Sequence, residues 1–325
     1  MTNGTIKNKS TGPRSLRAPF VHRRAQRSSP WLVAGLFIAI ALSNAQAETT
    51  NRWAAIFKSF QQEVLAKART NYPQFFPEVP LVKRTQFNLF STEQENNVGD
   101  HIWMQTATNS IPPDLAKAQE RLTNIAFRLV AAANTLSNIP RCSFEFRMVA
   151  NSNFNAFCCP GGKIGVNSGV LPIVRDDDEF SFVIAHEIGH ALARHGGETM
   201  TREVLRQKAL TGANFIADWA EHQKHLQKES VTNLMRGLDK ATLLTMILPH
   251  KREQEVEADH IGLIVMSKAG FRPQAAIDLW ERMAALQSNT NSPVVSKIAE
   301  YCRTHPPDAE RVANLKLWLP EVANK

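Results

Sequence analysis

The sequence is poor in cysteine and tyrosine, and it has no long apolar run after residue 47. Its 325 residues include only 4 Cys and 2 Tyr. Such scarcity of cysteine argues against a small scaffold held together by disulfides. A membrane-spanning helix needs roughly 20 apolar residues in succession, and none follows residue 47. Internal repeats and low-complexity linkers are also absent, so we expect one domain over residues 48–325.

Acidic residues are missing from the first 47 residues, where seven basic residues lie. These seven account for all but one of the formal net charge of +8. The remainder of the chain is nearly neutral and lacks the basic excess typical of nucleic-acid binding, so we expect no nucleic-acid partner. A composition of 43% hydrophobic and 21% charged residues is that of a globular protein.

Residues 1–47 have the three-part pattern of a secretory signal peptide. Basic residues precede an apolar run of twelve residues, 31–42, and Ala45-Gln46-Ala47 supplies a small-residue cleavage site. We therefore expect cleavage after Ala47 and export of residues 48–325 to the periplasm. The alternative is an uncleaved anchor in the inner membrane, which the unusually long basic region keeps open.

Export would permit disulfide bonds among Cys142, Cys158, Cys159 and Cys302. Adjacent cysteines rarely bond to each other, so a fully paired set would join Cys142 and Cys302 to one each of the adjacent pair. We expect at least two of the four to be buried free thiols instead. The spacing does not match a zinc knuckle, and neither adjacent cysteine lies at a helix N-terminus that would stabilise a thiolate.

The pattern of apolar residues predicts an α+β fold that is mostly helical, with one small sheet. Helical spacing covers residues 53–69 and 113–137, and it continues from residue 176 nearly to the end. Alternation with period two predicts a strand over 144–150, and two short strands are expected at 155–159 and 163–167. Residues 72–80 contain three prolines and are predicted to be extended.

The segment His186-Glu187-Ile188-Gly189-His190 is an HExxH motif. On a helix the two histidines are one turn apart, so both imidazoles project from one face and can bind a single zinc ion. Glu187 follows the first ligand and is placed to take a proton from water. The motif therefore predicts hydrolysis assisted by a metal ion.

Flanking residues indicate that the motif lies inside a helix. Asp176 is the expected N-cap, with Glu179 as its partner in a capping box. Gly196 and Gly197 are expected to end the helix.

A third ligand is predicted in the acidic segment that follows Pro249. Glu255 and Asp259 are four residues apart and share a helix face. Glu255 can complete a site of two histidines and one glutamate that leaves the fourth position open. Asp259 can hold a ligand histidine by its second ring nitrogen. Glu253 and Glu257 are assigned to the solvated face.

With these motifs the chain resembles the zinc metallopeptidase family that includes the HtpX and BepA bacterial proteases and the CAAX prenyl proteases. The similarity runs from about Phe90 to Leu319. The matching segments, in the family's order, are Asn155-Ala156-Phe157, Pro160-Gly161-Gly162-Lys163-Ile164, His186 to His190, Arg194-His195, Glu255 to Asp259, and His305-Pro306 with Arg311.

The resemblance implies a zincin-like domain with one zinc ion per chain. It gives His186, His190 and Glu255 as ligands, Glu187 as the catalytic base and Asp259 as support for a ligand. It also implies that the segment around residues 162–169 borders the cleft, where an extended substrate could add as a strand. The expected substrate-binding residues are Gly161, Gly162, Ile164 and Val166.

His305 and Arg311 each allow two interpretations, and His195 has one. In BepA-like relatives the histidine that matches His305 can reach the zinc as a fourth ligand and hold the enzyme shut; alternatively, His305 only orders the start of the last helix. Arg311 can lie near the developing oxyanion or form a salt bridge with a nearby acid. His195 is expected to be structural, because its offset from His190 turns it away from the metal.

The sequence thus predicts a zinc-dependent endopeptidase that acts on misfolded or unassembled envelope proteins in protein quality control, with peripheral membrane association as an option. The alternative is a periplasmic chaperone or assembly factor whose zinc site is latent or structural. Glu187 favours the enzyme, because a structural zinc site has no use for a base. Whether residues 198–250 form a lid over the cleft or pack beside it stays open.

Overall fold

The computed structural model describes residues 62, 65–71, 73–106, 111–211, 251–288, 298, 301, 305 and 309–323. The predicted signal peptide, its cleavage site, Cys302 and residues 212–250 lie outside the described residues. Of the helix predicted at 53–69, only the C-terminal part can be compared, and residues 65–71 are helical.

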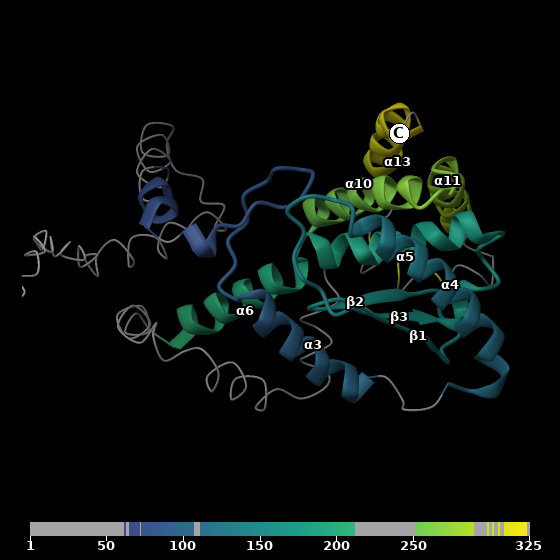
Figure 1. Cartoon of the computed structure of the whole chain (residues 1–325), viewed down its shortest axis with the longest axis horizontal. Helices are drawn as coiled ribbons and strands as arrows, with labels where there is room; N and C mark the ends of the chain where they lie inside the picture. Colours follow the sequence, from purple (N-terminus) through teal and green to yellow (C-terminus); the bar gives the residue numbers. More distant parts are fainter. Residues whose placement is uncertain are drawn as a thin grey trace, which may run out of the picture.

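Most of the described residues are helical, and three short strands form one sheet, which confirms the predicted α+β class (Figure 1). The α-helices are α3 (Thr92–Thr106), α4 (Ala116–Ala133), α5 (Asp177–Leu192), α6 (His195–Thr211), α10 (Arg252–Lys268), α11 (Gln274–Ser288) and α13 (Ala309–Ala323). Single 3-10 turns are η1 (Pro73–Phe75), η2 (Pro113–Leu115) and η3 (Ser168–Val170). The turn η1 interrupts the segment 72–80, which was predicted to be extended throughout.

The sheet has the strand order β1-β3-β2, with β1 at Glu145–Val149, β2 at Ala156–Cys159 and β3 at Lys163–Asn167. All three predicted strands are confirmed. The central strand β3 is parallel to β1 and antiparallel to β2, and every one of its residues is buried. Its two edges are therefore both occupied by neighbouring strands.

Helix α5 lies between the sheet and α10, and it packs most extensively against α10 (Figure 1). The two helices approach backbone to backbone at two glycines. A Cβ atom on Gly189 would lie 2.6 Å from the carbonyl oxygen of Ala258, and one on Gly262 would lie 3.0 Å from that of Ala185. This close approach brings the HExxH residues of α5 next to the acidic residues of α10.

The N-cap of α5 agrees with prediction, whereas the partner in its capping box and its end do not. The Asp176 carboxylate accepts the N–H of Glu179 at 2.9 Å, as an N-cap should. The Glu179 carboxylate accepts instead from the backbone N–H of Arg175 at 2.8 Å. The chain reverses at Arg194, which has a φ of 58°, so α5 ends at Leu192 and the two glycines expected to stop it lie inside α6.

Two apolar clusters form most of the core in the described residues, and a third, small cluster surrounds Ala68. The larger joins α4, α5, α10 and α11 to the sheet. The smaller joins α3, β2 and α6 through Phe90, Val98, Ile102, Trp103, Cys159 and Met200. Cys142, Cys158 and Cys159 are free thiols, so the fully paired arrangement is not formed. Among the helices in the described ranges, none is long and apolar enough to cross a membrane.

Candidate metal centre and active site

Helices α5 and α10 bring the predicted ligands together in a buried cluster. The Nε2 atoms of His186 and His190 are 3.1 Å apart, and each lies close to the Glu255 carboxylate, at 3.3 and 3.5 Å respectively. His305 joins them, and the four ligand atoms all lie within 4.8 Å of one another. All four side chains are buried.

This arrangement fits a single metal ion. Around a tetrahedral zinc with bonds of about 2.0–2.2 Å, neighbouring ligand atoms are about 3.3–3.6 Å apart, close to the distances found here. In the described part of the chain, both carboxylate oxygens of Glu187 and Oε1 of Glu255 have no hydrogen-bond partner. Buried carboxylate oxygens without donors are costly unless a cation or substrate group satisfies them.

Asp259 contacts His186 on the side of the ring away from the cluster. Its Oδ1 is 2.9 Å from Nδ1 of His186, which leaves Nε2 of that ring facing the cluster. Arg311 clamps Asp259 with two hydrogen bonds of 2.6 and 2.8 Å and lies 3.0 Å from Glu255. Of the two roles considered for Arg311, the geometry favours the salt bridge, because the guanidinium is committed to these carboxylates.

Burial and charge together set the protonation states in the cluster. When no metal is bound, burial outweighs the opposing charge of His186 and raises the pKa of Glu187 to about 7, with a smaller contribution from the charge of Glu255. Burial also acts on Asp259, but Arg311 outweighs it and lowers the pKa of Asp259 to about 2. For His186 the carboxylates of Asp259 and Glu255 overcome the effect of burial and raise its pKa to about 9 when no metal is bound.

His305 closes the cluster from the segment that precedes α13. Its Nε2 is 3.6 Å from Oε1 of Glu187, and its ring is stacked on Tyr301 with centroids 4.5 Å apart. Its backbone N–H donates to the Tyr301 carbonyl at 2.7 Å. Burial and the neighbouring charges of His186 and Arg311 hold the pKa of His305 well below its usual range. The contact between Tyr301 and His305 was not predicted.

The expected substrate-binding residues do not lie at an edge of the sheet. Ile164 and Val166 are fully buried in the central strand β3, and Gly161 and Gly162 form the turn before it. An extended substrate cannot pair with a strand whose two edges are already occupied. The sequence predicted the strands but not their order, so this expectation is corrected: the edge strand that packs on α5 is β2.

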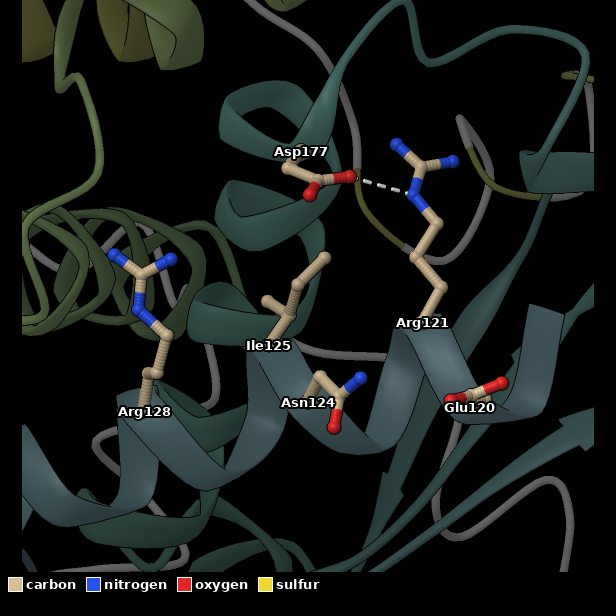
Figure 2. A pocket seen from close by; sticks show the side chains of 6 residues that line it. All are labelled: Glu120, Arg121, Asn124, Ile125, Arg128 and Asp177. Atoms are coloured by element: carbon tan, nitrogen blue, oxygen red, sulfur yellow. Dashed lines mark hydrogen bonds and ion pairs between the residues drawn. The ribbon is translucent and has the colours of Figure 1, made fainter. Parts of the chain in front are cut away.

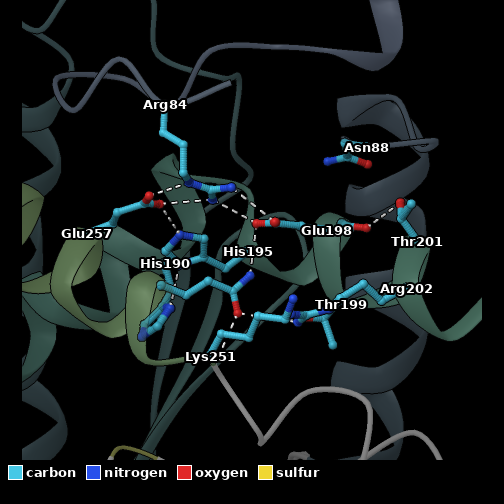
Figure 3. A network of polar contacts seen from close by, with 12 residues as sticks. Arg84, Asn88, His190, His195, Glu198, Thr199, Thr201, Arg202, Lys251 and Glu257 are labelled. Carbon is cyan, nitrogen blue, oxygen red and sulfur yellow. Dashed lines mark hydrogen bonds and ion pairs between the residues drawn. The ribbon is translucent and has the colours of Figure 1, made fainter. Parts of the chain in front are cut away.

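A polar network lies behind His190, and one of its members, Glu257, was predicted to be solvated (Figure 3). His195 lies outside the ligand cluster, as predicted, and its Nδ1 is 2.8 Å from Nδ1 of His190, on the side of that ring away from the cluster. Glu257 is not solvated but 8% exposed, because His195 and Arg84 both bind its carboxylate. Glu253 is exposed, as predicted.

Residues 116–319 match the profile of peptidase family M48. The chain belongs to peptidase family M48. Among its relatives, the mitochondrial metalloendopeptidase OMA1 of Saccharomyces cerevisiae is 31% identical over 262 residues, which cover 77% of this chain and 71% of the relative. OMA1 of Schizosaccharomyces pombe is 29% identical, with 85% and 80% covered. The beta-barrel assembly-enhancing protease of Yersinia pestis is 31% identical over 232 residues, 70% of this chain and 44% of the relative.

Family membership makes this chain a metal-dependent peptidase whose substrates are polypeptides. The buried His/Glu cluster could hold the metal ion that such an enzyme requires. The adjacent cysteines do not offer a competing nucleophile, since burial raises the pKa of Cys158 well above its usual range and that of Cys159 to about 12. A thiolate is therefore not available in this M48 peptidase near neutral pH.

A surface pocket lies away from this centre, on the outer side of α4 (Figure 2). Its lining residues are Glu120, Arg121, Asn124, Ile125, Arg128 and Asp177. Arg121 and Asp177 form an ion pair of 2.6 Å across it. The pocket contains none of the residues that the sequence assigned to the M48 active site.

Proposed function

We propose that this M48 peptidase is a zinc-dependent endopeptidase in which His186, His190 and Glu255 bind the ion and Glu187 is the base. The observation that supports this proposal is the spacing of the three ligand atoms, 3.1 to 3.5 Å, directly beside a buried glutamate that has no hydrogen-bond partner among the described residues. Two histidines and one glutamate form a common ligand set of hydrolytic zinc sites.

Glu187 performs the proton transfers in this proposal. A zinc ion supplies a Lewis acid that polarises the peptide carbonyl and acidifies water. Glu187 takes the proton from the attacking water and gives it to the amine that leaves. When no metal is bound, burial raises the pKa of Glu187 to about 7, so this carboxyl group has a higher proton affinity than an exposed glutamate. Asp259 and Arg311 hold His186 in the tautomer that presents Nε2 to the ion.

The substrate is expected to lie along β2. This strand is at the edge of the sheet and packs on the helix that carries Glu187. Main-chain pairing with an edge strand binds an extended polypeptide with little regard to its sequence. This mode suits a peptidase that removes misfolded proteins.

We further propose that the substrates are envelope proteins and that the enzyme acts in their quality control after export. The signal-peptide pattern of residues 1–47 supports export to the periplasm, and peripheral association with the membrane is compatible with it. Relatives in Yersinia pestis and Escherichia coli are named beta-barrel assembly-enhancing proteases, which supports an envelope substrate.

His305 is proposed to occupy the fourth position of the zinc site in a closed state. Its position within the ligand cluster and the lowered pKa that keeps its imidazole neutral support this role. A neutral imidazole in that position excludes water, so Glu187 has no proton to take. Opening would require His305 to leave its stack with Tyr301.

The test is digestion of unfolded casein by the purified protein, with Glu187→Gln as the comparison. The wild type should cleave casein and lose activity with a chelator, and Glu187→Gln should lose at least 10²-fold in rate while keeping its zinc. A wild type that carries zinc, does not cut, and prevents aggregation of an unfolded client equally well with Glu187→Gln would instead identify a chaperone.

A further inference from the structure

A continuous chain of contacts runs from the second ligand histidine to a loop before the family domain (Figure 3). His190 Nδ1 is 2.8 Å from Nδ1 of His195, and Nε2 of His195 is 3.0 Å from Oε2 of Glu257. Arg84 binds the Glu257 carboxylate through Nε and through Nη2, the latter at 3.0 Å. Arg84 also bridges to Glu198 on α6 at 2.8 and 3.1 Å.

If His195 is neutral, the donors and acceptors along this chain of contacts allow only one arrangement of protons on the two imidazole rings. Glu257 is bound by the Arg84 guanidinium and accepts from Nε2–H of His195, so Nδ1 of His195 carries a lone pair. That lone pair accepts the Nδ1–H of His190, and Nε2 of His190 is then free of a proton. This nitrogen is the one that faces His186 and Glu255.

The two ligand histidines are supported in parallel ways. His186 is held by Asp259, whose carboxylate is clamped by Arg311. His190 is held by His195, which is held in turn by Glu257 and Arg84. In both cases the series of contacts ends at a carboxylate that an arginine binds. The series behind His190 differs by one additional imidazole, that of His195.

The terminal arginine comes from outside the residues that match the family profile. Arg84 precedes residues 116–319 and lies in a tight loop that the Val79 N–H closes on the Arg84 carbonyl at 2.7 Å. Two non-glycine residues of this loop, Leu81 and Lys83, have positive φ values of 67° and 54°. The loop thus holds a specific conformation that directs Arg84 between α6 and α10.

We propose that His195, Glu257 and Arg84 are positioning residues for the metal centre, and that they fix His190 in its metal-binding tautomer and orientation. This inference rests on the proposed zinc site. It assigns the loop at 79–84 a function in metal binding, in addition to its contacts with α6 and α10. Groups that orient a metal ligand typically contribute 10- to 100-fold to metal affinity.

The test measures the zinc dissociation constant of the full-length protein by competition with a chromophoric chelator. His195→Leu removes the acceptor for His190 and should raise the constant 10- to 100-fold. His195→Asn places a side-chain oxygen near the position of Nδ1 and should recover part of the loss. Glu257→Gln and Arg84→Met should each weaken zinc binding by a smaller factor. The visible spectrum of the cobalt-substituted protein should change in His195→Leu and stay close to wild type in His195→Asn.

Two matched controls separate positioning from packing. His260→Gln and Glu253→Gln change a histidine and a glutamate of α10 that lie outside the chain of contacts, and both should bind zinc like the wild type. If the chain of contacts only packs α6 against α10, the His195, Glu257 and Arg84 variants will lower the melting temperature of the metal-free protein while their zinc affinity stays within twofold of wild type. That result overturns the proposal but leaves the zinc site intact, whereas a wild type that binds no zinc overturns both. Should His195→Leu fail to fold, Glu257→Gln and His195→Asn decide between the outcomes.

Discussion

Glu187 combines complete burial with a pKa of about 7, and burial is the larger cause of that shift. In water the same carboxyl group titrates near 4.3 and is a poor proton acceptor. When no metal is bound, the environment therefore raises the proton affinity of the carboxyl group that we propose as the base. Among its charged neighbours, His186 on α5 lowers this pKa, and Glu255 on α10 raises it by a smaller amount.

His305 offers a direct test at the scale of one residue. We expect His305→Ala to keep zinc bound by the other three ligands and to raise casein cleavage severalfold, because the fourth position becomes open to water. Zinc content and initial rates measure both effects, with His260→Ala as a control at a histidine that is not in the ligand cluster.

The opposite result has a specific meaning. A loss of activity of 10² to 10³-fold in His305→Ala would show that the imidazole stabilises the transition state. An activity within twofold of wild type would show that His305 only orders the start of α13.

The sequence predicts the identity of the central residues better than their partners. His186, Glu187, His190, Glu255 and Asp259 follow from spacing on two helices, because residues four apart share a face. The pairing of Asp259 with Arg311 spans 52 residues, and the burial of Glu257 depends on a loop from another part of the chain. Contacts of this kind depend on the tertiary fold, which no local pattern encodes.

At the scale of elements, the contact between α5 and α10 determines whether the ligands meet. Gly189→Ala would place a Cβ 2.6 Å from the Ala258 carbonyl oxygen, and the backbone there cannot yield as a flexible side chain would. The gain in helix propensity is about 1 kcal/mol, and we expect the steric cost to exceed it, for a net loss of about 1–3 kcal/mol.

Urea unfolding of the metal-free protein measures this effect without the contribution of the ion. Glu253→Ala, an exposed change on α10, should stay within about 0.5 kcal/mol of wild type. A Gly189→Ala protein as stable as wild type would show that the two helices are not in close backbone contact.

The ion pair that joins α6 to the loop at 79–84 predicts a dependence on pH. Burial alone would raise the pKa of Glu198, but the hydrogen bonds and charge of Arg84 outweigh it and lower that pKa. Glu198 therefore stabilises the fold at pH values above its pKa in the unfolded chain, about 4.3. This stabilisation is lost as the pH falls through the lower pKa of Glu198 in the folded protein.

Glu198→Gln should cost about 1–3 kcal/mol at pH 7, and the difference from wild type should shrink at pH 3.5. Urea unfolding at both values measures it, with Glu253→Gln as the control. A difference that grows in acid would contradict the assigned ion pair.

Helix α3 shows what the periodicity of apolar residues leaves out. This helix was not predicted, because most of its residues are polar and few of them form an apolar stripe. The residues at its start nevertheless match a known capping pattern. Ser91 and Gln94 form a reciprocal capping box, with bonds of 2.8 and 3.2 Å between each side chain and the other's backbone N–H. No such sequence pattern marks the early end of α5. There Arg194 adopts a left-handed conformation, which its contacts with Glu95 support.

At the scale of the whole molecule, the N-terminal pattern predicts processing of the chain. Cleavage after Ala47 should leave Glu48 as the first residue of the exported protein. Mass spectrometry of protein recovered from the periplasmic fraction tests this prediction. An intact chain in the membrane fraction would show that residues 31–42 act as an anchor instead.

The metal content of the purified protein tests the central claim most directly. Elemental analysis should find about one zinc ion per chain in the wild type and in Glu187→Gln, because Glu187 is the base and not a ligand. His186→Ala and Glu255→Gln should both lose most of that zinc, with their folds checked by circular dichroism. Full retention of zinc in both ligand variants would contradict the assignment of the metal centre.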